Sequence, residues 1–75
     1  MEISLTTVLD RGAKYQGNNP DNLTRRIALA NLLVDARIVR TTEAGQLLFR
    51  IWAAPESRDH PVEALIALAN QKAPR

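Results

Sequence analysis

Hydrophobic residues are concentrated in the middle of the chain, between residues 22 and 52, where they make up more than half of the positions. We therefore expect this segment to supply most of the core, with the flanking residues packed around it. At 75 residues, the chain is short enough to form one domain, 1–75.

Three segments combine helical apolar spacing with the end signals of helices. The first spans about 4–15, because Ser4 is a suitable N-cap and apolar residues follow at positions i, i+3 and i+4. The second spans about 21–36 and follows a Gly-Asn-Asn-Pro breaker, with Asn19 or Asp21 as its cap. It is apolar on almost all sides, which is typical of a central helix. The last spans about 61–72 and has a one-sided apolar stripe.

Residues 38–52 allow two interpretations. The run from Ile38 is rich in β-branched residues, Glu43-Ala44-Gly45 can form a turn, and the following residues alternate between apolar and other side chains. This pattern predicts a β-hairpin and, with the three helices, an α+β winged-helix-like domain. The alternative is a helix capped at Thr41 or Thr42, which would make an all-α four-helix domain. We adopt the hairpin because two β-rich runs flank a turn that contains glycine.

The basic residues are also unevenly distributed. The net charge is +2, and eight of the ten bases are arginine, the side chain best suited to bidentate contacts with phosphate. Residues 11–50 contain seven bases and three acids, an excess of +4. The simpler explanation of these charges is a solvated surface with scattered salt bridges.

The pattern over residues 22–52 resembles that of winged helix-turn-helix regulators. The resemblance is carried by Leu32-Leu33-Val34-Asp35-Ala36-Arg37-Ile38-Val39-Arg40 and by Gly45-Gln46-Leu47-Leu48-Phe49-Arg50-Ile51. It implies that the helix before the hairpin enters the DNA major groove and that the wing contacts the backbone. The helix exit in this family usually carries a glycine, and Arg37 stands near that place. The nucleic-acid-binding residues expected on this basis are Arg25, Arg26, Arg37, Arg40 and Arg50.

No sequence pattern indicates catalysis or metal binding. The chain has no cysteine, and its one histidine, His60, stands beside a proline, where a helix cap or an exposed side chain is expected. We therefore expect a protein that is not an enzyme, with no cofactor, metal or small-molecule substrate. The first residues do not resemble a signal peptide, and the longest apolar run is far shorter than the ~20 residues of a membrane span. We expect a cytoplasmic protein with no membrane partner.

A chain of this size has a thin core, which favours association with a partner. We expect the partner or dimer interface to consist of Trp52, Val62, Leu65, Ile66 and Ala69. The alternative is that these residues pack within their own domain. The predicted function is a small nucleic-acid-binding transcription regulator that forms a homodimer through its last helix. The alternative is a small adaptor or inhibitor, of phage or plasmid type, that acts by binding another protein.

Overall fold

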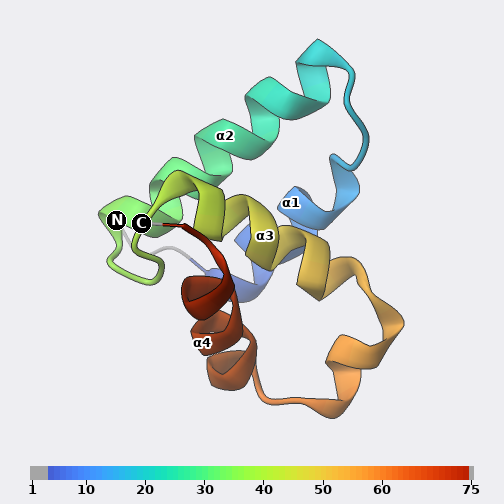
Figure 1. Ribbon diagram of the computed structural model, residues 1–75. Coiled ribbons are helices and arrows are strands. Elements are labelled where there is room, and N and C mark those ends of the chain that lie inside the picture. Colours follow the sequence, from blue (N-terminus) through green and yellow to red (C-terminus); the bar gives the residue numbers. More distant parts are fainter. Residues whose placement is uncertain (1–3, 75) are drawn as a thin grey trace.

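The structure is a computed structural model that describes residues 4–74, and the regular secondary structure of this part is all helical. Figure 1 shows α3 crossing the middle of the molecule, with α2 above it, α1 behind it and α4 below it. The α+β winged-helix prediction is therefore wrong, and the all-α alternative describes the fold. The elements are α1 (Leu5–Lys14), α2 (Pro20–Asp35), α3 (Thr42–Ala53), the 3₁₀ helix η1 (Pro55–Asp59) and α4 (Val62–Lys72).

The segment predicted as a hairpin, 38–52, contains most of α3. Thr41 caps this helix, because its Oγ1 accepts a hydrogen bond of 3.0 Å from the backbone N–H of Ala44. Glu43 lies in the first turn, where a negative charge is favourable to the helix dipole. Gly45, expected at the hairpin tip, lies inside the helix. The helical alternative, capped at Thr41 or Thr42, is confirmed with Thr41 as the cap.

The packing of α3 explains why its glycine is not a turn residue. Gly45 lies against α2, and a Cβ added to it would stand 2.7 Å from the Cβ of Ala30. Gly12 of α1 lies on the ring of Phe49, which occupies the space that a larger side chain would need. Both glycines therefore allow a neighbouring helix to approach α3 closely. Leu48 and Phe49 are both completely buried, which a half-buried strand with alternating faces would not permit.

The other helix predictions are close to the observed bounds. The predicted cap at Ser4 is confirmed, since its Oγ accepts a hydrogen bond of 3.4 Å from the backbone N–H of Thr7. Helix α2 begins at Pro20, and Asn19 is its cap, with its Oδ1 accepting a hydrogen bond of 2.9 Å from the backbone N–H of Asn22. Pro61 occupies the N-cap position of α4, which has no side-chain capping bond.

None of the helices within residues 4–74 has both the length and the continuous apolar character that crossing a bilayer requires.

Candidate nucleic-acid interface

The structure separates the five arginines that were predicted to bind nucleic acid. They do not form one continuous face. Arg26 is buried between α1 and α2, while the other four are exposed. The exposed ones lie at the start of α2, in the turn between α2 and α3, and on α3 itself: Arg25, Arg37, Arg40 and Arg50.

Arg26 holds the corner between α1 and α2 together. Its side chain is only 8% exposed, and its Nη1 donates hydrogen bonds to the backbone carbonyls of Tyr15 and Gly17, the latter at 2.7 Å. These carbonyls lie just beyond the C-terminal end of α1, where the helix leaves acceptors without intrahelical partners and where a positive charge is favourable. Arg26 is thus occupied by the protein's own backbone, and its side chain is not available to phosphates or bases.

Arg25, one residue earlier, has a different environment. It is exposed, and its guanidinium carbon lies 5.3 Å from the centroid of the Tyr15 ring, within the range of a cation–π contact. Arg25 and Tyr15 line a shallow hollow, together with Arg11 of α1 and the apolar residues Ala28 and Leu29 of α2. Nothing in the sequence connects Tyr15 with Arg25, because the two residues are brought together only by the corner between α1 and α2.

Arg37 ends α2 in a strained conformation. Its φ is 62°, in the left-handed region where glycine is favoured, so the absence of the expected glycine has a structural consequence. The N–H of Arg37 donates to the carbonyl of Val34, and the N–H of Ile38 donates to the carbonyl of Leu33, both at 2.9 Å. These two bonds form a Schellman motif, which satisfies the last carbonyls of α2. The Arg37 side chain is exposed.

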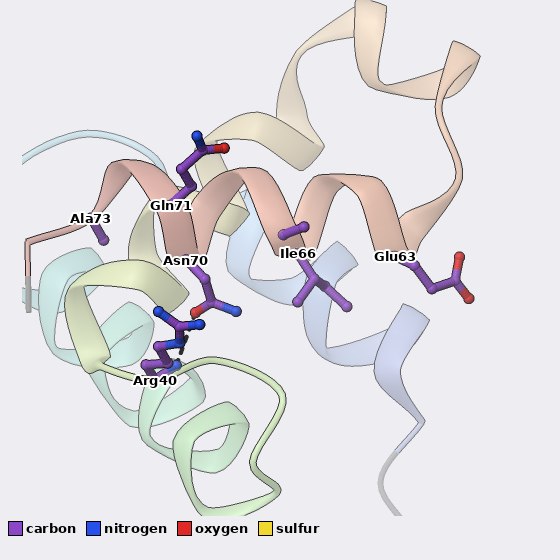
Figure 2. Close-up of a pocket in the computed structure, with 7 residues that line it drawn as sticks. Arg40, Glu63, Ile66, Asn70, Gln71 and Ala73 are labelled. Atoms are coloured by element: carbon purple, nitrogen blue, oxygen red, sulfur yellow. Dashed lines mark hydrogen bonds between the residues drawn. The ribbon is translucent and has the colours of Figure 1, made fainter.

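Arg40 lies immediately before the cap of α3 and is fixed through its backbone. Its N–H donates to Oδ1 of Asn70 on α4 at 2.9 Å, and Nδ2 of Asn70 donates to the carbonyl of Ile38 at 3.5 Å. Figure 2 shows the Arg40 side chain beside Asn70, while Glu63 lies at the far end of α4 and is turned away from it. The surrounding hollow has a volume of about 600 Å³. The guanidinium of Arg40 is therefore presented to solvent from a well-anchored turn.

Arg50 belongs to a polar row on the exposed side of α3. Glu43 and Arg50 are exposed and Gln46 is half-buried, and their spacing of i, i+3 and i+7 places them on one face. Arg50 shares a hollow with Lys72 of α4, and this hollow also includes Glu43 and Gln46. In the predicted hairpin, Gln46 and Arg50 would also share a strand face, but Glu43 would lie in the turn, so the hairpin prediction missed that Glu43 continues this row. The helical alternative would have found it.

The residues expected at a partner interface are largely covered by the domain itself. Leu65 is 3% exposed and Ala69 is completely buried, both within the core. Trp52, Val62 and Ile66 are half-buried and pack against that core. Any role of these residues in contacting a second chain stays a prediction.

Within residues 4–74, no group of three or more His, Asp or Glu side chains is placed to hold a metal ion. His60 lines a hollow of about 460 Å³ together with Asp10, whose carboxylate accepts a hydrogen bond of 2.8 Å from the indole N–H of Trp52. Ser57 lines the same hollow, and its hydroxyl donates to the backbone carbonyl of Trp52 at 3.1 Å. These polar groups thus join α3 to its neighbours.

Comparison of the chain with models of protein families, with curated proteins and with solved structures finds no match.

Proposed function

We propose that this protein is a small DNA-binding regulator that contacts duplex DNA with the exposed side of α3 and with the turn before it. The observation that carries the proposal is an arrangement: two exposed arginines, Arg37 and Arg40, lie in the turn that leads directly into α3. This helix has a polar row in which Glu43 and Arg50 are exposed and Gln46 is half-buried. An α-helix fits the major groove of B-form DNA, and an adjacent turn then lies near the phosphate backbone.

The side chains of the polar row are suited to reading base edges. Arginine can donate two hydrogen bonds to guanine, glutamine can pair with adenine, and glutamate can accept from cytosine. Arg50, Gln46 and Glu43 follow one another along a single face of α3, so they can meet successive base pairs. Leu48, on the face of α3 opposite the row, and Phe49, beside it, are both completely buried, which holds the row rigidly on the domain.

The turn arginines are suited to phosphate. Arg40 is anchored by its backbone bond of 2.9 Å to Asn70, so its side chain extends from a fixed position. Arg37 occupies a left-handed position, φ 62°, where glycine would be less strained. A long cationic side chain at this position therefore costs stability, and contact with a phosphate is a reason for its presence.

The experiment is a binding titration of the full chain with random-sequence duplex DNA at about 50 and about 200 mM salt, monitored by fluorescence anisotropy. We expect binding that weakens with salt, with a slope of about 0.9 per neutralised phosphate. Arg37→Gln and Arg40→Gln should each lower that slope by about 1. Arg58→Gln, which alters an exposed arginine of η1, is the matched control and should leave the slope unchanged.

A second arm separates base reading from phosphate contact. Selection of preferred sites from a random duplex library should give a consensus for the wild type, and Gln46→Ala with Arg50→Ala should remove it while non-specific affinity largely persists. Absence of duplex binding at about 50 mM salt would exclude this function, since non-specific affinity arises from the phosphate contacts themselves.

A second candidate function, binding to another protein, is favoured by a different observation. Leu23 and Ile27 lie one turn apart on α2 and are 40% and 36% exposed, and adjacent exposed apolar side chains often mark contact surfaces. If the protein is an adaptor or inhibitor, Ile27→Glu should abolish capture of its partner and leave duplex binding unchanged. Leu68→Glu, which alters a 36% exposed leucine on α4, is the control.

A further inference from the structure

We propose a second binding site, at the corner between α1 and α2, that takes the phosphate group of a nucleotide. The site is a hollow of about 240 Å³ that belongs to neither the α3 row nor the turn before it. It therefore goes beyond the proposed duplex contact and can be tested separately. Its lining consists of two arginines, one tyrosine and two apolar residues of α2: Arg11, Tyr15, Arg25, Ala28 and Leu29.

The charges of the hollow favour an anion. Arg11 and Arg25 both line it, and no carboxylate does so among the residues that the structure describes. Lys14 is exposed one turn after Arg11, and Asp21 is exposed one turn before Arg25, outside the lining. Two guanidinium groups on one hollow repel each other, and a group with two negative oxygens removes that repulsion and accepts bidentate hydrogen bonds. A phosphate has this chemistry.

The arginine and the tyrosine are held in place before any ligand binds. The guanidinium of Arg25 lies 5.3 Å from the centroid of the Tyr15 ring, which restricts the positions that this long side chain can occupy. Buried Arg26 donates to the carbonyl of Tyr15 and thereby ties this residue to α2. Part of the entropy cost of binding is thus met by the fold, which favours a specific site over a mobile basic surface.

The apolar side of the hollow indicates what accompanies the phosphate. Leu29 is half-buried and Ala28 is exposed, and both line the hollow beside the Tyr15 ring. A sugar or base attached to the phosphate can contact these surfaces, whereas inorganic phosphate cannot. The hollow is smaller than the roughly 300 Å³ at the lower end of ligand pockets, so it holds the phosphate end and leaves the rest of the nucleotide partly in solvent.

The test is an NMR titration of the full ¹⁵N-labelled chain with a nucleoside 5′-monophosphate and, separately, with the parent nucleoside and with inorganic phosphate. We expect saturable shifts confined to the five lining residues, including the guanidinium Nε–H signals of Arg11 and Arg25. The nucleoside should produce no such shifts, and inorganic phosphate should bind more weakly.

Variants locate the site. Arg11→Gln and Arg25→Gln should each weaken nucleotide binding about tenfold, the effect of losing one charge-assisted hydrogen bond. Tyr15→Phe, which retains the ring, should leave the affinity within about twofold. Arg58→Gln is the matched control and should not change it. Circular dichroism of each variant shows that the helices are retained.

The outcomes are distinct. No saturable shift, or shifts that persist in Arg25→Gln, would overturn the proposal, and equal affinity for inorganic phosphate would overturn the nucleotide as ligand class. A 5′-phosphorylated single-stranded oligonucleotide that binds much more tightly than the monophosphate identifies a strand end as the source, and equal affinity identifies free nucleotide. Nucleotide binding by a wild-type protein that has no affinity for duplex DNA at about 50 mM salt would exclude the proposed duplex contact and leave this site standing.

Discussion

Helix α2 is connected at each end by a polar corner that contains arginine, and the two corners use arginine in different ways. At the first corner, between α1 and α2, buried Arg26 donates to the carbonyls of Tyr15 and Gly17. At the second, between α2 and α3, the last carbonyls of α2 accept from backbone N–H groups, and the carbonyl of Ile38 accepts from Asn70. The side chains of Arg37 and Arg40 remain exposed.

The difference follows from how each preceding helix ends. Helix α2 closes with a Schellman motif, which satisfies its terminal carbonyls without any cationic side chain. Beyond the C-terminal end of α1, the backbone carbonyls of Tyr15, Gln16 and Gly17 instead accept hydrogen bonds from side chains. Arg26 donates to the first and the third, and Nδ2 of Asn22 donates to the carbonyl of Gln16 at 2.8 Å. A guanidinium becomes part of the scaffold where backbone acceptors are left over, and it is free for a ligand where they are not.

The largest expected effect on stability comes from replacing Arg26 of α2, compared with replacing its neighbour Arg25. Arg26→Met should lower the free energy of unfolding by about 3 kcal/mol, because two charge-assisted hydrogen bonds are lost and their carbonyls lose a partner. Arg25→Met, the matched control, should cost only about 0.5 kcal/mol, since it removes an exposed cation–π contact. Urea unfolding measures both. Equal costs would show that Arg26 does not hold the first corner.

The contact where α2 crosses α3 lies between the two corners, and a substitution there should lower the stability nearly as much. Gly45→Ala should destabilise the protein by about 2 kcal/mol, because the new methyl would stand 2.7 Å from the Cβ of Ala30 and force the helices apart. Gly17→Ala provides a contrast: its added Cβ would meet only the side chain of Asn22, at 4.0 Å, and its cost arises from φ 98°. Thermal unfolding measures the stability of both variants. Duplex binding of Gly45→Ala then shows whether the displacement of α3 from α2 also disturbs the proposed DNA-contacting face.

Much of the fold followed from the sequence where end signals and periodicity agreed. Ser4, Asn19 and Pro20 marked the starts of α1 and α2 because caps act through local hydrogen bonds. Residues 38–52 failed because their β-branched and alternating pattern fits either structure over so short a window. The choice was made by tertiary contacts, namely the close approach of Gly45 to Ala30 and the burial of both Leu48 and Phe49.

The site was less predictable than the fold. The sequence indicated an excess of arginine, and the resemblance implied the same nucleic-acid-binding role for Arg25 and Arg26. It could not show that Arg26 reaches back to Tyr15 and Gly17, because that contact depends on how the corner folds. The alignment of Glu43 with Gln46 and Arg50 was missed because the hairpin prediction placed Glu43 in a turn.

Asn70 tests whether the second corner is held from α4. Asn70→Ala should cost about 1 kcal/mol, since it removes the acceptor for the N–H of Arg40 and the longer bond to the carbonyl of Ile38. Asn70→Asp keeps the acceptor and should recover most of this loss. If the corner positions Arg40, Asn70→Ala should also weaken duplex binding in the anisotropy titration, while Asn70→Asp should weaken it less. Unchanged affinity in Asn70→Ala would show that the turn does not need α4.

The one substitution expected to increase stability is at Arg37. Arg37→Gly should raise the free energy of unfolding by about 0.5–1 kcal/mol, because glycine tolerates φ 62° at the end of α2 without steric strain. The same change should weaken duplex binding and reduce its salt dependence, because it removes a phosphate contact. Arg37→Ala separates the two effects, since it loses the charge but keeps the strained Cβ: it should bind as weakly as the glycine variant without becoming more stable. A glycine variant that is more stable and binds duplex as well as the wild type would show that the second corner, like the first, uses its arginine for something other than DNA.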